Sequence, residues 1–254
     1  MSQITPSRPS SSQDPSGAHS AEGGRAVHAG QGWTWITDGF ELFKKQPGIW
    51  IAIAVVLFVI LVALALIPLL GAIGTFLLLP VFVGGMMIGC RDLQRDGVLK
   101  VEHLFAGFRT QTGNLIVLGA LSIVGWFIVM LPMMGIMGVG AFFGIMRGDA
   151  AGMVAMGGSF LLAWLIAMAL SVLVYMAFWF APALVVLRGL APGTAIRQSF
   201  FGCLKNVMPF LIYGLVMLVL SVIASIPFLL GWVVLAPVMI ASVYVSYRDI
   251  YGEA

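Results

Sequence analysis

Charged residues are scarce in this sequence of 254 residues, since aspartate, glutamate, lysine and arginine together make up 9% of it. Soluble domains carry about 25% charged residues and about 45–50% apolar residues, whereas 61% of this chain is hydrophobic. A water-soluble fold of this length could not bury so much apolar surface. The composition therefore excludes a soluble globular protein and predicts one membrane-embedded domain.

Cysteine and histidine are equally rare, with two and three residues respectively. Cys90 and Cys203 have no neighbouring histidine and no metal-ligand spacing, so we expect buried, reduced thiols and no disulfide. The third histidine, His103, lies far from the other two in the chain. Methionines cluster near residue 133, but without cysteine or histidine beside them they are typical of adaptable packing. We therefore assign no metal ion and no cofactor.

Long apolar runs are abundant. A helix needs about 20 residues to cross a hydrocarbon core of about 30 Å, and six stretches qualify: residues 48–70, 72–90, 115–134, 159–187, 207–226 and 228–246. An apolar, glycine-rich extension beyond residue 134 could lengthen the third helix, re-enter the membrane or lie at its surface. The sequence predicts an all-α polytopic bundle of about six transmembrane helices, and leaves the conformation of residues 135–158 open.

Residues 1–32 differ sharply from the rest, because they are rich in serine, proline and glycine and lack periodic apolar positions. Such a segment cannot bury enough apolar area to offset its ordering entropy. We predict a disordered cytoplasmic tail over residues 1–32 and a six-helix membrane domain over residues 33–254. The first apolar run begins only after Pro47, so the first span is expected to be retained rather than cleaved as a signal peptide.

The positions of the basic residues predict an orientation. In a six-span arrangement twelve of the 13 lysines and arginines fall on one side and only Arg147 falls on the other. Setting aside the two arginines of the tail still leaves a ratio of ten to one. Since basic loops stay in the cytoplasm, we expect a multi-pass membrane protein with both termini in the cytoplasm.

An internal repeat is visible in the second and sixth spans. Pro80 is followed eleven residues later by Arg91-Asp92, and Pro237 is followed eleven residues later by Arg248-Asp249. Pro182 with Arg188 suggests a fainter middle copy. Amphipathic segments precede the three hairpins, at residues 33–45, 101–109 and 195–205. The pattern predicts three units, each made of a surface helix and a helical hairpin. Parallel repeats occur in transporters, although duplication can equally serve to build a bundle.

Aspartate, glutamate, lysine, arginine and histidine are absent from all six predicted spans. Buried ionisable groups usually mark proton relays, ion pathways and substrate sites in membranes. Their absence argues against a proton-coupled transporter with an intramembrane carboxylate and against an intramembrane metalloprotease. Serines such as Ser122 and Ser242 have no basic partner that could activate a nucleophile, so we expect them to hydrogen-bond between helices. We predict no catalytic residue.

The Arg-Asp pairs occur where spans leave the membrane, and two interpretations are open. In one, each arginine anchors to headgroups with the adjacent aspartate as its partner. In the other, Arg91, Arg188 and Arg248 converge in one cytoplasmic vestibule and bind a phosphate or a carboxylate. These three arginines are the candidate contacts for anions or lipid headgroups.

The segment from Trp35 to Pro47 has the pattern Trp-x-x-x-Gly-Phe-x-Leu-Phe-x-x-x-Pro, and the chain closes with Tyr-x-x-Tyr-Arg-Asp at residues 244–249. These features resemble a family of uncharacterised bacterial six-helix inner-membrane proteins over about residues 33–251. A fainter similarity is to the membrane domain fused to some glycerophosphodiester phosphodiesterases, whose catalytic barrel is absent here. The resemblance implies an inner-membrane location and lends no activity.

These observations predict an integral membrane protein that is not an enzyme. The leading expectation is a structural, assembly or lipid-interacting component, and the alternative is a transporter or channel for a small molecule or ion. The expected partners are the lipid bilayer and anionic lipid headgroups. No nucleic acid is expected, and the sequence indicates no protein partner.

Overall fold

The computed structural model describes residues 23–228 and 230–252, and every regular element among them is a helix. The helices are α2 (Gln31–Lys45), α3 (Pro47–Ala65), α4 (Leu70–Arg95), α5 (Gly107–Thr110), α6 (Thr112–Arg147), α7 (Ala150–Phe178), α8 (Ala181–Arg188), α9 (Pro192–Lys205), α10 (Val207–Ser225) and α11 (Trp232–Tyr251), with a 3₁₀ helix, Val101–Phe105, before α5. Six stretches of helix are long and apolar enough to cross a membrane, with α7 and α8 counted as one. The predicted all-α, six-helix fold is confirmed.

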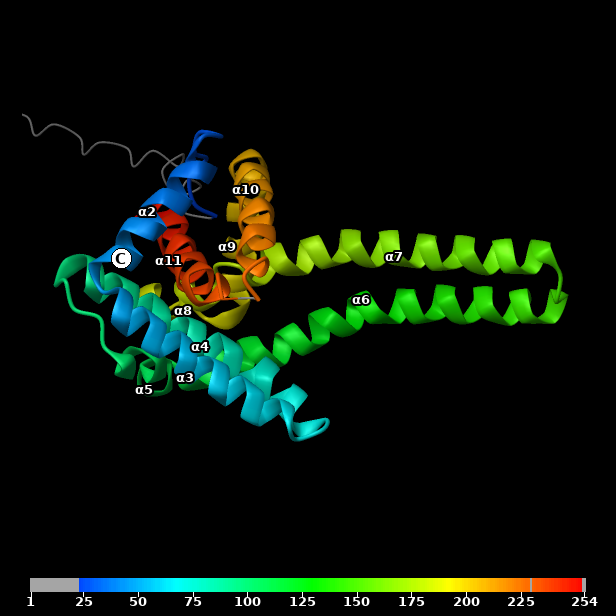
Figure 1. The fold of residues 1–254 in the computed structure, drawn as a ribbon, viewed down its shortest axis with the longest axis horizontal. Helices are drawn as coiled ribbons and strands as arrows, with labels where there is room; N and C mark the ends of the chain where they lie inside the picture. Colours follow the sequence, from blue (N-terminus) through cyan, green and yellow to red (C-terminus); the bar gives the residue numbers. More distant parts are fainter. Residues whose placement is uncertain (1–22, 229, 253–254) are drawn as a thin grey trace, which may run out of the picture.

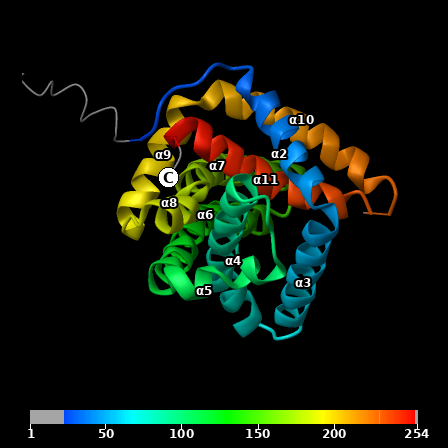
Figure 2. The ribbon, with the colours of Figure 1, turned by 90° about the vertical axis from the view of Figure 1, so that its left-hand side faces the viewer.

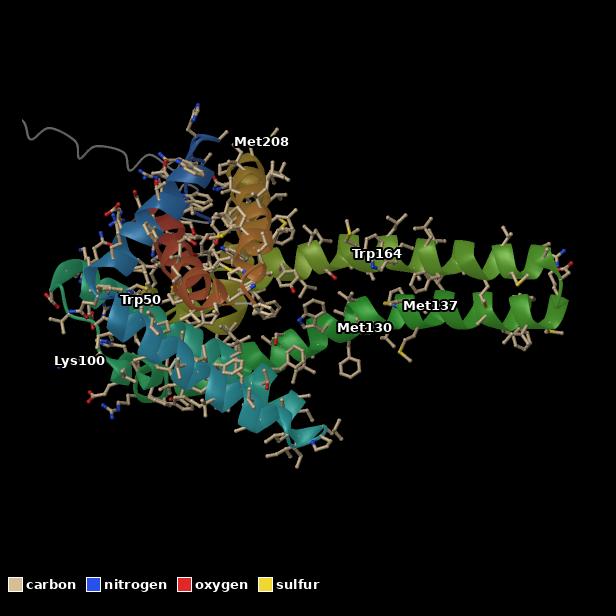
Figure 3. All side chains as sticks on the ribbon, in the orientation of Figure 1. Trp50, Lys100, Met130, Met137, Trp164 and Met208 are labelled. Carbon is tan, nitrogen blue, oxygen red and sulfur yellow. The ribbon has the colours of Figure 1, made fainter. Side chains whose placement is uncertain are left out.

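The third and fourth spans are much longer than a membrane requires. Helix α6 has 36 residues, which at 1.5 Å per residue makes it about 54 Å long. Residues 135–146 lengthen α6, and α7 starts directly after Gly148 and Asp149. The resulting hairpin extends far beyond the other helices in Figure 1. Figure 3 places Met130, Met137 and Trp164 on this hairpin, well away from Trp50 and Lys100.

The other two hairpins end in turns of similar design. In each turn the residue after a proline has a positive φ, 61° at Leu69 and 49° at Phe228, although neither is a glycine. Gly71 and Gly231 then lie so close to the backbone of the preceding helix that a Cβ would clash with it. This geometry is shared by the two turns, while the division into three units of surface helix plus hairpin stays a prediction.

The hairpins diverge from the end of the molecule where α4, α8 and α11 finish, which we call the charged end. Figure 2 shows the α3–α4 turn and the α10–α11 turn pointing in different directions, while α6 and α7 run away behind them. About half of the most apolar stretch of α4 and of α11 is buried, 50% and 56%, whereas the other four spans bury 11–22%. Helices α4 and α11 therefore form the centre of the protein.

Helix α2 packs closely on α10 and α11 through glycines. A Cβ on Gly32 would lie 2.2 Å from the carbonyl oxygen of Pro209 in α10, and one on Gly39 would lie 2.8 Å from the amide nitrogen of Ser242 in α11. Trp35, on the same helix, is buried. The amphipathic segment predicted at residues 33–45 is thus a helix that covers the centre of the fold.

A serine hydroxyl interrupts the fourth span between α7 and α8. The amide of Phe180 donates to Ser199 Oγ at 2.9 Å, and that hydroxyl donates to the carbonyl oxygen of Met176 at 2.8 Å. Ser199 of α9 therefore replaces the direct helical bond from residue 180 to residue 176. Inserting a side chain into the backbone ladder is a known cause of helix kinks, and it turns α8 towards α4 and α11.

The buried serines of the spans bond mainly within their own helices, which corrects the expectation of hydrogen bonds between helices. Ser122 donates to the carbonyl oxygen of Gly119, and Ser246 donates to that of Val243. Only Ser242, among these three, also bonds to another helix, through the hydroxyl of Tyr213 at 2.8 Å. Backbone carbonyls of a helix readily accept such local bonds.

Two boundaries differ from the prediction. The segment predicted as a helix at residues 101–109 is a 3₁₀ helix followed by the short α5. The predicted tail, residues 1–32, lies outside the described residues as far as residue 22. Its last ten residues have a defined place, because Asn206 Nδ2 donates to the carbonyl oxygen of Arg25 at 3.0 Å and Val27 N donates to Asn206 Oδ1 at 2.7 Å. Asn206 is fully buried, so residues 23–32 belong to the folded domain.

Candidate functional site

The three candidate arginines come from three different spans at the charged end. Arg91 lies in the last turns of α4, Arg188 ends α8, and Arg248 lies in the last turn of α11. Arg91 and Arg248 line one small hollow, and Tyr247 forms part of its wall. Arg188 and Arg91 both lie close enough to the Tyr247 hydroxyl to act on it electrostatically. The structure therefore brings all three arginines to one place.

Arg188 is held by the end of α11. Its guanidinium donates to the backbone carbonyl of Tyr251 and lies over the Tyr251 ring, 5.6 Å from the centroid. The Tyr251 hydroxyl in turn donates to the carbonyl oxygen of Gln198 in α9 at 2.8 Å. Arg188 thus ties α8 to α11 and supplies positive charge behind the hollow.

In the first Arg-Asp pair the aspartate is the partner of the arginine, and the anchoring of this arginine to headgroups stays a prediction. Arg91 Nε lies 3.2 Å from Asp92 Oδ1, and His103 Nε2 lies 3.3 Å from the other carboxylate oxygen. The terminal nitrogens of Arg91 make no further hydrogen bond in the part of the chain that the structure describes. They remain able to donate towards the hollow.

In the second Arg-Asp pair the aspartate is not the partner of the arginine. Asp249 turns away from Arg248, and its carboxylate accepts from Arg25 Nη2 at 2.8 Å and from Trp35 Nε1 at 3.0 Å. Arg25 also bonds to the backbone of Asp249 and Ile250. Within residues 23–228 and 230–252 the Arg248 guanidinium has no hydrogen bond or ion pair, so its charge is not compensated by its neighbour.

Tyr247 is the residue of this site that the sequence did not identify. Tyr247 is 1% exposed, and its hydroxyl makes no well-aligned hydrogen bond among the described residues, with the Arg188 guanidinium near enough to be a weak partner. A buried hydroxyl without a partner costs about 1–3 kcal/mol, so such groups usually have a reason. The available signal was its place directly before Arg248-Asp249 in the closing Tyr-x-x-Tyr-Arg-Asp pattern.

The hollow has a volume of about 20 Å³, which is enough for one water-sized group. It can admit a single oxygen of an anion, whose remaining atoms would stay at the mouth. Arginine nitrogens and a phenol hydroxyl are donors. The chemistry that this arrangement supports is binding of a negatively charged oxygen.

A second, larger hollow of about 540 Å³ lies on the other side of Asp92. Asp96, Lys100, His103 and Arg109 also border it, so charges of both signs face it. No group of three or more histidine, cysteine or acidic side chains that could hold a metal occurs in the described part of the chain.

Among the described residues, three grooves have apolar walls: two lie where neighbouring hairpins separate and one lies between α2 and the third hairpin. The largest, of about 510 Å³, runs between α2 and the α10–α11 hairpin and includes Phe40, Ile223 and Val234. A groove of about 260 Å³ lies between α7, α9 and α10, and one of about 270 Å³ lies between α4, α6, α7 and α8. Their walls are aliphatic and aromatic almost throughout.

Both cysteines are free and buried. Cys203 lies in α9, outside the spans, where burial raises the pKa of its thiol to about 12 against a small opposing effect of the Ser199 hydroxyl. A thiol with so high a pKa carries almost no thiolate near neutral pH, and the thiolate is the reactive form.

Comparison with known proteins gives one informative relative. A probable inner membrane protein of Burkholderia thailandensis is 28% identical over 252 residues, which cover 89% of this chain and 93% of that protein. No protein-family model and no solved structure matches. The relative fits the uncharacterised membrane family indicated by residues 35–47, while the similarity to phosphodiesterase membrane domains stays a prediction. With six helices able to cross a membrane, the chain is an integral, multi-pass inner membrane protein.

Proposed function

We propose that this protein is a non-enzymatic, lipid-interacting component of the inner membrane, with both termini in the cytoplasm. One observation carries the proposal: grooves with apolar walls open between neighbouring hairpins and between α2 and the α10–α11 hairpin. In a bilayer, acyl chains are the available material that matches such walls. The expected occupants are the acyl chains of phospholipids.

The largest groove has features of a site for a whole lipid. Its apolar walls come from α10 and α11, while Thr37 and Glu41 of α2 stand at its border. Lys44 pairs with Glu41 at 2.6 Å and lies 5.4 Å from the centre of the Phe40 ring. A lipid with its chains in this groove would therefore meet polar and cationic groups at the level of its headgroup.

The composition of the spans supports a non-catalytic role. Ionisable residues occur only at the ends of the six spans, and the buried Ser122 and Ser246 are satisfied by carbonyls of their own helices. A proton relay or an ion pathway would need polar groups that continue from helix to helix. This favours lipid interaction over the alternative of a transporter or channel.

Filling the largest groove should displace lipid. Ile223 lines this groove and Val222, its neighbour on α10, lies outside it; both are exposed. We expect Ile223→Trp to lower the amount of phospholipid retained after purification in mild detergent about tenfold, because losing about 60 Å² of apolar contact costs about 1.4 kcal/mol. Native mass spectrometry measures the retained lipid.

Val222→Trp is the matched control, since it adds the same side chain to the same helix. It should retain lipid as the wild type does. Equal retention by both variants and the wild type would contradict the groove assignment, and a wild-type protein that carries no lipid under these conditions would contradict the proposed function as a whole.

A further inference from the structure

We propose that Arg91, Arg248 and Tyr247 form a binding site for a phosphate group, with Arg188 adding charge behind it. The inference rests on the proposed function and deepens it, because it names the part of the lipid that this site selects. The hollow admits one oxygen, and Arg91, Arg248 and Tyr247, which are among the residues that line it, are hydrogen-bond donors at neutral pH.

Two observations independently point to a ligand. Tyr247 borders the hollow, and its buried hydroxyl has no well-aligned partner among the described residues, with only the Arg188 guanidinium near enough for a weak interaction. The Arg248 guanidinium lacks a partner in the same part of the chain because Asp249 is occupied by Arg25 and Trp35. An anion in the hollow would satisfy both groups at once.

The charge balance favours an anion strongly. Arg91, Arg95 and Arg248 line the hollow and Arg188 acts on the neighbouring Tyr247, while Asp92, the carboxylate paired with Arg91, is shared with His103. Like charges gathered in a partly buried place repel one another, and an anion relieves that repulsion. Arginine suits the purpose because its planar fork matches phosphate oxygens and is weakly hydrated.

The position of the site favours phosphate over carboxylate. The helices that supply the three arginines are the ends of spans, so the site lies at the depth where headgroup phosphates gather. Donors approach from two different helices, Arg91 from α4 and Arg248 and Tyr247 from α11. A tetrahedral phosphate offers oxygens in several directions, whereas a carboxylate offers two oxygens in one plane. The phosphate can belong to an anionic lipid or be free in solution, and the experiment separates these sources.

The test compares Arg248→Gln and Tyr247→Phe with Arg147→Gln, which removes one charge at the distant α6–α7 turn. The full chain is equilibrated with equal amounts of phosphatidylglycerol and phosphatidylethanolamine, and native mass spectrometry gives the ratio of the two bound lipids. We expect the wild type to prefer the anionic lipid. Arg248→Gln should lower the ratio about tenfold and Tyr247→Phe several-fold, since charge-assisted hydrogen bonds are lost. Arg147→Gln should leave it unchanged.

A second arm measures thermal unfolding with inorganic phosphate or with chloride at equal ionic strength. If phosphate stabilises the wild type and stabilises Arg248→Gln less, the site exists and binds free phosphate. If only the preference for the anionic lipid is seen, the site exists and binds the phosphate of a lipid headgroup. Variants that match the wild type in both arms, or an equal effect of Arg147→Gln, overturn the proposal. If the variants retain as much total lipid as the wild type and show the same ratio of the two lipids, only this phosphate site is refuted. A phosphate response in a protein that retains no lipid refutes only the proposed function.

Discussion

Replacing Gly39 by leucine is expected to prevent the protein from folding into a stable monomer. The position has no room for a side chain, because a Cβ there would lie 2.8 Å from the backbone nitrogen of Ser242 and 3.0 Å from its Cα and Cβ. The obstructing atoms belong mostly to the backbone of α11 and cannot turn aside. Overpacking a core costs about 3 kcal/mol in unfavourable cases, and here the larger side chain must separate two helices at the centre of the fold.

Gly214→Leu is the control for this change. Gly214 lies in the middle of α10, and no atom stands within 4 Å of the position that its Cβ would take. The same substitution there should leave size-exclusion elution and thermal unfolding in detergent unchanged, while Gly39→Leu should give aggregated protein. If the two variants elute and unfold alike, α2 does not pack on α11 as described.

Ser199→Ala is expected to destabilise the protein through a single hydroxyl group. Both backbone groups that bond to this hydroxyl, the amide of Phe180 and the carbonyl of Met176, would lose their partner. Ser199 and Phe180 are fully buried, so water does not replace the lost bonds. Each unsatisfied group costs about 1–3 kcal/mol. The melting temperature in detergent should fall clearly below that of the wild type.

Ser171→Ala provides the comparison within the same span. The Ser171 hydroxyl donates to the carbonyl oxygen of Ala167 in its own helix at 2.7 Å, a carbonyl that the helix already satisfies. Its loss should change stability by less than about 0.5 kcal/mol. Equal stability of both alanine variants would show that the joint between α7 and α8 does not depend on the inserted hydroxyl.

The number and kind of the spans could be predicted because long uncharged runs leave a chain few alternatives in a bilayer. The meeting of Arg91 and Arg248 was also within reach, since each follows the proline of its span at the same distance. The conformation of residues 135–146 could not be predicted from the sequence. An apolar, glycine-rich segment has the same composition in a long helix and in a re-entrant loop, and the choice depends on contacts such as that of Gly140 with Ser159.

The electrostatics of the site depended on contacts that leave no mark in a single sequence. The bond between Arg25 and Asp249 joins residues 224 positions apart, and Arg25 stands in a stretch whose composition is typical of disorder. Without that contact, Asp249 would be taken as the partner of Arg248. The missing partner of the Tyr247 hydroxyl likewise became visible only once α4, α8 and α11 were placed together.

The most direct test of the whole account is the side of the membrane on which the charged end lies. Ala150→Cys at the α6–α7 turn and Asp96→Cys at the end of α4 are both exposed positions, while the native Cys90 and Cys203 are buried. A membrane-impermeant maleimide applied to intact spheroplasts should label the Ala150→Cys variant and should reach the Asp96→Cys variant only after lysis. Labelling of the Asp96→Cys variant in intact spheroplasts would contradict a charged end that faces the cytoplasm.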